Sequence, residues 1–178
     1  MSAKLIFAVG VLGVGGYFGK QMASYDPTIY PYSKTQVQQI LNEAKTVLPR
    51  RDGPGQIEIW GAGKIERGAA LKMQYADWAP VIACDAIVTE IAPDKSRVVP
   101  NCEGPVDASS ALSRTHAELR VPMFFEHIQS TLQRRAFDRK RVDNKEAAAV
   151  LKNLGGMQRE ALKASDEMQQ MQAEAEEE

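Results

Sequence analysis

Hydrophobic and polar residues change their spacing along the chain, and these changes predict the order of its elements. Between residues 33 and 48 the apolar positions recur at helical spacing, and Ser33 with Gln36 forms a capping box. From Gln56 onward apolar and polar residues alternate, as they do in a strand with one buried face. The alternation predicts strands at 56–60, 71–76, 81–91 and 97–102, with weaker patterns at 28–30 and 117–121.

Helical spacing returns after the predicted strands. Pro122 begins a predicted helix that carries an apolar stripe, and Asp143 with Glu146 forms a second capping box for a helix that Gly155 ends. In the last segment Met157, Ala161, Met168 and Met171 can line one side of a helix, which suits contact with a partner.

Strands joined by turns, without helices between them, are typical of an antiparallel sheet. The sequence therefore predicts an α+β fold in which such a sheet packs on a long helix (helix-grip-like), preceded by an N-terminal membrane helix and followed by C-terminal helices. The chain divides into a membrane anchor or signal segment at 1–23, an α+β domain at 24–142 and a helical extension with an acidic tail at 143–178.

The N-terminal residues have the layout of a membrane anchor or a signal peptide. An uncharged run from residue 5 to residue 19 lies between Lys4 and Lys20. The segment 3–23 is interpreted as a retained span, as a cleaved signal or as a buried soluble segment. The positive charge before the run favours export of the remainder. We therefore expect a single-pass inner-membrane protein with a periplasmic domain, or a secreted protein if the segment is cleaved.

Composition narrows the classes of function. The formal net charge is -1, which gives no overall attraction to nucleic acid. The two cysteines are too few for a disulfide scaffold or a four-cysteine zinc site. Folding the strands at 81–91 and 97–102 about their turn brings Cys84 near Cys102, so export predicts a disulfide between them, whereas a reducing cell would keep two thiols.

Residues with catalytic potential are few. His116 and His127 are the only histidines, and the chain has no metalloprotease, nucleophile-elbow or phosphate-loop motif. The sequence thus predicts no catalytic residue, no metal site and no cofactor. One basic cluster suits either an anion or a solvated helix end, and it consists of Arg134, Arg135, Arg139 and Arg141.

The order of elements resembles a known superfamily. A short strand at Thr28-Ile29-Tyr30, a helix opening S-K-T-Q-V-Q-Q-I-L, antiparallel strands and a long helix P-M-F-F-E-H-I-Q-S-T-L are similar to START-like, polyketide-cyclase-like (SRPBCC) helix-grip proteins. The resemblance spans about residues 24–132. It implies a curved sheet that grips the long helix around an apolar cavity, with ligand binding more widespread among members than catalysis. The anchor, the compact strand region and the C-terminal helices depart from that pattern.

The function predicted from these features is binding of an apolar small molecule or lipid by an exported, membrane-tethered domain. The candidate residues, which equally suit a packed core, are Trp60, Met73, Tyr75, Phe124, Phe125, Ile128 and Leu132. The alternative is a structural or interaction subunit of a membrane complex, which would use the C-terminal helices and a glycine-faced span formed by Gly15, Gly19 and Ala23, with a homodimer as one form. A cyclase-like or hydrolase-like enzyme ranks third.

Overall fold

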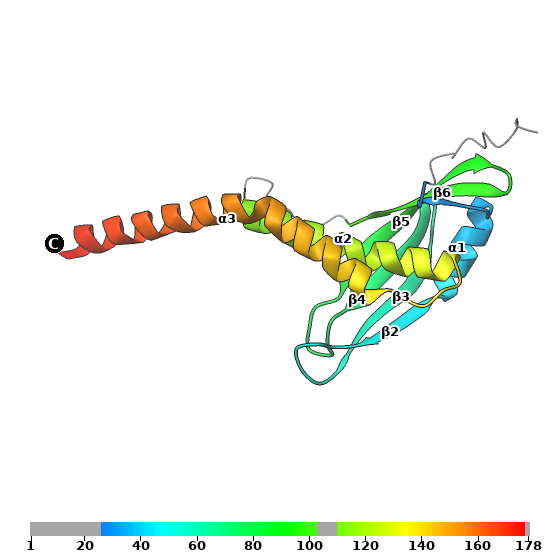
Figure 1. Cartoon of the computed structure of the whole chain (residues 1–178), viewed down its shortest axis with the longest axis horizontal. Helices are drawn as coiled ribbons and strands as arrows, with labels where there is room; N and C mark the ends of the chain where they lie inside the picture. The colour runs from blue at the N-terminus through cyan, green and yellow to red at the C-terminus, as the bar shows by residue number, and fades with distance from the viewer. Residues whose placement is uncertain (1–25, 103–109, 177–178) are drawn as a thin grey trace, which may run out of the picture.

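The computed structural model describes residues 26–102 and 110–176 (Figure 1). The elements, in chain order, are β1 (Ile29–Tyr30), α1 (Lys34–Glu43), β2 (Lys45–Pro49), β3 (Gln56–Ile65), β4 (Gly68–Gln74), β5 (Ile82–Ala92), β6 (Lys95–Asn101), α2 (Ala111–Leu132) and α3 (Arg139–Glu176). The α+β class with an antiparallel sheet is confirmed. The predicted membrane segment, residues 3–23, lies outside the described residues.

The six strands form one antiparallel sheet in the order β1-β6-β5-β4-β3-β2. The first strand therefore lies beside the last, with Ile29 opposite Arg97. The sheet curls around one side, where α1 contacts β3, β4, β5 and β6 and also contacts α2 (Figure 1). The connections between strands β2 to β6 are hairpins, which explains why alternation alone located them.

Alternation in the central strands separates a buried face from an exposed one. Ile57 and Ile59 of β3 are buried, and Ile59 lies opposite the buried Met73 of β4. Glu58 and Trp60, which alternate with these isoleucines along β3, point to the other face of the sheet, because successive side chains on a strand alternate. The buried face meets α1 and α2 and forms the core of the domain.

The predicted disulfide is confirmed. Cys84 of β5 and Cys102, which follows β6, are bonded with their Cα atoms 4.1 Å apart. The register places Asp85 opposite Asn101, so the two cysteines are direct neighbours across the antiparallel pair. The bond therefore joins the beginning of β5 to the end of β6.

The first predicted helix is too long. It ends at Glu43 and not at residue 48, and Lys45–Pro49 forms β2 on the edge of the sheet. Ala44 has extended dihedral angles, and β2 then pairs with β3 along its whole length. The pairing gives the half-buried Leu48 a place against the core that a continued helix would not provide.

The start of α2 also differs from the prediction. Residues 111–121, predicted as loop and strand, are helical, and Pro122 lies inside the helix. Ser110 caps the helix, because its Oγ accepts a hydrogen bond from the backbone of Ser113. Glu160 of α3 accepts a second one from the backbone of Ala111 at 2.6 Å. These caps and the packing of α3 along α2 stabilise the turns before the proline.

The C-terminal helix begins earlier and ends later than predicted. Asp138, not Asp143, caps α3, since its Oδ1 accepts a hydrogen bond from the backbone of Arg141 at 3.0 Å. Gly155 and Gly156 do not end the helix, which continues to residue 176. A Cβ at position 156 would come within 2.9 Å of the Cβ of Ala111, so the missing side chain allows α3 to approach the start of α2.

Two glycines, one in close contact with the backbone and one with room for a side chain, predict opposite effects of an added methyl group. A Cβ at position 61 would meet the carbonyl oxygen of Leu41 at 2.3 Å, so Gly61→Ala should lower the free energy of unfolding by about 1–3 kcal/mol. Gly155→Ala meets only Arg159 at 3.8 Å and should raise it by about 0.5–1 kcal/mol through helix propensity. Chemical denaturation measures both, and an equal effect of the two variants would contradict the assigned packing.

Candidate functional site

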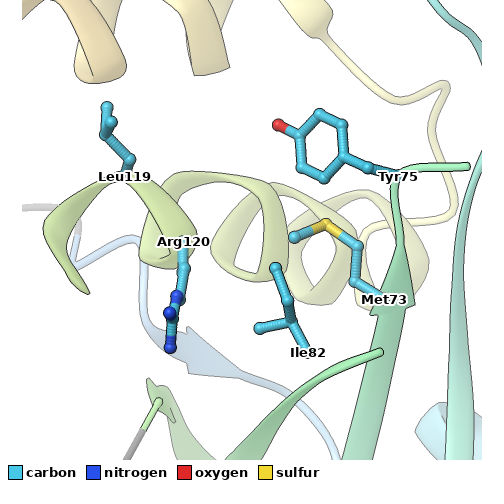
Figure 2. Close-up of a pocket in the computed structure, with 5 residues that line it drawn as sticks. All are labelled: Met73, Tyr75, Ile82, Leu119 and Arg120. Atoms are coloured by element: carbon cyan, nitrogen blue, oxygen red, sulfur yellow. The ribbon is translucent and has the colours of Figure 1, made fainter. Parts of the chain in front are cut away.

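A pocket of about 280 Å³ opens between the sheet and α2. Its lining residues are Met73, Tyr75, Ile82, Leu119 and Arg120. The first three come from the end of β4 and the start of β5, and the last two come from α2. Figure 2 shows Ile82 between the Arg120 side chain and Met73, with the Tyr75 ring above Met73. The site is therefore an apolar hollow with a cation on one side and a hydroxyl on the other.

Arg120 is the charged group of this pocket. Its side chain is half-buried, and within residues 26–102 and 110–176 it forms no ion pair. The other residues of the lining are apolar except for the hydroxyl of Tyr75. A guanidinium beside such a surface can pair with a carboxylate, sulfonate or phosphate that arrives with an apolar molecule.

Tyr75 lies close to charged residues of α3. Burial raises the pKa of the Tyr75 phenol, and the nearby Glu146 carboxylate raises it further, whereas Arg139 lowers it. Burial also raises the pKa of Glu146, whose Oε1 has no hydrogen-bond partner among the described residues. Both shifts favour the neutral form of the group, so Tyr75 presents a hydroxyl donor to the pocket at neutral pH.

The structure brings two of the seven candidate ligand-binding residues, Met73 and Tyr75, to this pocket. Three others from α2 are in the core, namely Phe124, Ile128 and Leu132. Phe125 is half-buried, and the Nζ atom of Lys145 lies 4.0 Å from the centre of its ring. Trp60 is on the opposite face of the sheet and is not brought together with the rest.

Sequence patterns did not reveal Leu119 and Arg120. The segment that contains them was predicted as a strand, and the helix was predicted to begin at Pro122. The signal that could have found them is the position of Leu119, which lies four residues before the buried Met123 and thus on the same helix face.

The basic cluster is largely neutralised inside the molecule. Both oxygens of the buried Glu126 carboxylate bind the Arg135 guanidinium, and Oε1 also accepts the backbone N–H of Asp138 at 2.9 Å. Arg139 donates to Asp143 at 3.1 Å, and Arg141 lies 3.8 Å from Glu126. Three of the four arginines proposed for an anion therefore have carboxylate partners, which leaves little charge for a ligand; Arg134 is exposed.

His127 is a buried structural residue. Its Nδ1 lies 2.8 Å from the Thr46 hydroxyl of β2, and its Nε2 has no hydrogen-bond partner in the described part of the chain. Burial lowers the pKa of the imidazole to about 4, so the ring is neutral at pH 7. The contact ties α2 to the edge strand of the sheet.

Metal-ligand clusters and membrane-spanning helices are both absent from residues 26–102 and 110–176. In these ranges no three His, Cys, Asp or Glu residues come together to hold a metal ion. None of the helices described there is long and apolar enough to cross a bilayer. The chain matches no protein-family model, no curated protein and no solved structure.

Loss of the buried carboxylate should destabilise the fold. Glu126→Gln leaves Arg135 without its anion, so we expect the free energy of unfolding to fall by about 3 kcal/mol. Glu118→Gln on the same helix removes the exposed ion pair with Lys152 and keeps an oxygen that can accept from Asn153, so it should cost less than about 1 kcal/mol. Urea denaturation of the two variants tests this difference, and equal losses would show that Glu126 has no special part in stability.

Burial of His127 predicts a loss of stability in acid. The unfolded imidazole takes up a proton near its ordinary pKa of 6.5, whereas the folded one does so only near 4. Its contribution, about 3 kcal/mol, is therefore complete above pH 6.5 and disappears as the pH falls to about 4. His127→Gln should flatten the dependence of unfolding free energy on pH across this window. Parallel curves for the variant and the wild type would refute the assignment.

Proposed function

We propose that the chain binds a small apolar molecule that carries one anionic group, in the pocket between β4, β5 and α2. The observation that carries this proposal is the position of Arg120 beside an apolar hollow formed by Met73, Ile82 and Leu119. The apolar wall supplies the driving force by removing ligand surface from water, and the guanidinium fixes the orientation. The Tyr75 hydroxyl offers a second polar contact.

The size of the pocket limits the ligand. Its volume of about 280 Å³ is just below the range of ligand pockets in proteins, which measure roughly 300–1,000 Å³. A single aromatic or short aliphatic acid fits this volume, and the apolar part of a lipid would have to extend beyond it. We thus propose that the pocket holds one ring system of a ligand or the end of one aliphatic chain.

The arrangement of elements supports a helix-grip assignment, which we also propose. The first strand pairs with the last, and the order β1-β6-β5-β4-β3-β2 lets the curled sheet hold α1 and α2 on its inner side (Figure 1). The long α3 distinguishes this chain from the superfamily that it resembles. Ligands of that superfamily bind between sheet and long helix, as proposed here.

We also propose that the domain is exported from the cytosol. The support is the Cys84–Cys102 disulfide, because such bonds persist in oxidising compartments and are rare in the cytosol. The uncharged run at 5–19 supports a membrane tether or a signal at the N-terminus. A tethered domain would meet its ligand at the outer surface of the inner membrane.

Binding of 1-naphthoate, which has an apolar ring system and one carboxylate, tests the pocket. With the full chain in lipid nanodiscs, calorimetry should show binding that Arg120→Gln weakens about tenfold and Leu119→Trp abolishes by filling the hollow. Arg67→Gln, the same charge change at an exposed turn, should leave the affinity unchanged. Empty nanodiscs give the background. Equal affinity of the Arg120, Leu119 and Arg67 variants would disprove the site.

A second function, an interaction subunit, is favoured by one observation. Met168 and Met171 of α3 are 56% and 60% exposed, although large apolar side chains normally find cover. Exposed apolar side chains on this segment suit contact with a partner and not the binding of a ligand in the pocket. The two functions use different parts of the chain and do not exclude each other.

A further inference from the structure

The distal arm, defined as residues 161–176 of α3, extends beyond the rest of the domain (Figure 1). The last polar contacts between α3 and α2 are made by Glu160, which accepts hydrogen bonds from Ser110 and Ala111. From residue 161 to residue 172 every side chain is exposed except Ser165, which is half-buried. Within the described residues the distal arm therefore has no packing partner.

A helix of this kind needs a partner to be stable. At about 1.5 Å per residue the distal arm is roughly 24 Å long, and isolated helices near this length are marginal in water. Most helical stability in proteins comes from packing of an apolar face. The distal arm carries such a face, and none of the residues in 26–102 and 110–160 covers it. We therefore expect its partner in another molecule.

The apolar face has the spacing of a coiled coil. Five residues of the distal arm follow one another at intervals of three and four, and they are Ala161, Ala164, Met168, Met171 and Ala175. Met157, about one turn earlier, continues this spacing, but its sulfur already contacts the Thr115 hydroxyl of α2. Intervals of this kind fill the a and d positions of a heptad repeat, the seam that meets a second helix. Leu162 is 66% exposed but lies outside the seam, at position b.

We propose that the partner is a second copy of this chain, whose distal arm pairs with the first in antiparallel orientation. When the seam is reversed, every methionine meets an alanine. Met168 lies opposite Ala164 of the second copy, and Met171 lies opposite Ala161. This inference specifies the partner of the interaction function proposed above and rests on that function.

Alternation of large and small residues across facing positions is what a close-packed interface requires. A parallel pair in register would place methionine on methionine and alanine on alanine, so its layers would alternate between crowded and empty. The seam is thus complementary to the same seam running in the opposite direction. A helix of unrelated sequence would have this complementary pattern only by chance. This property is the reason for choosing a second copy over a different protein.

The charges beside the seam give the association a salt dependence. Glu167, at position g, lies next to Glu167 of the second copy in the antiparallel arrangement, and Lys163 at 3.7 Å partly neutralises it. Ser165, at position e, lies next to Ser165 of the second copy, and this uncharged pair adds no repulsion. Because salt screens repulsion between exposed like charges, association should strengthen as ionic strength rises. Pairing with a basic helix would weaken instead.

A photo-crosslinking residue at Gln158 tests the proposal. Gln158 is exposed and at position e, where the antiparallel pair brings it near Gln172 of the second copy. Irradiation of the full chain, in cells and in nanodiscs, should give a covalent dimer in which the link joins Gln158 to the tryptic peptide 164–178. The readout is at the arm, so dimers formed through residues 3–23 do not contribute to it.

Variants of the seam give matched controls. Met168→Glu should lower the yield of the crosslinked dimer at least tenfold, whereas Leu162→Glu, the same kind of change outside the seam, should leave it unchanged. Ala164→Met should weaken association by crowding, and adding Met168→Ala should restore it, because the exchanged pair again joins large to small. Circular dichroism of each variant verifies that the domain, which the distal arm does not contact, is folded.

Each other outcome overturns the inference in a recognisable way. A link to the peptide that contains Gln158 itself would indicate a parallel pair, and equal yields from the Met168 and Leu162 variants would show that the seam is not used. An adduct with another protein would reject the second copy while supporting an interaction function. No adduct in cells or in nanodiscs would reject both.

Discussion

The middle of α2 is enclosed on both sides, and the positions of the pocket and of α3 depend on that burial. Met123, Phe124 and Ile128 are completely inaccessible to solvent. At about 1.5–3 kcal/mol for each buried side chain of this size, they make α2 a main source of stability. Two polar residues between them also have partners on other elements, since Glu126 binds Arg135 and the Nδ1 atom of His127 contacts Thr46. With α2 fixed in this way, Leu119 and Arg120 face β4 and β5, and α3 packs along α2.

Much of the sheet could be predicted from the sequence, because apolar and polar residues alternate along strands that have one buried face. Ile57 and Ile59 are buried and Glu58 between them is not, as the pattern required. The same reasoning brought Cys84 near Cys102, although the final register depended on the bulge between Glu90 and Ala92, which alternation does not show. The α+β class and the disulfide could therefore be predicted, whereas the pairing of β1 with β6 could not.

The helix boundaries and the pocket depended on contacts between distant residues. Pro122 and Gly155 are ordinary signals for a helix start and a helix end, but the packing of α2 against α3 overrode both. The stretch at 45–49 has apolar residues that suit either a helix or a strand, and pairing with β3 decided for the strand. Because the true start of α2 was missed, Arg120, the one charged residue of the pocket, was missed as well.

The sulfur atoms of this chain would respond to an oxidant in two different ways. The Cys84–Cys102 bond is formed by oxidation and afterwards resists it. Met168 and Met171 are exposed, and peroxide converts such thioethers to sulfoxides, which are polar and can be reduced again by dedicated enzymes. An oxidant would thus leave the folded domain intact while making the outer end of α3 hydrophilic.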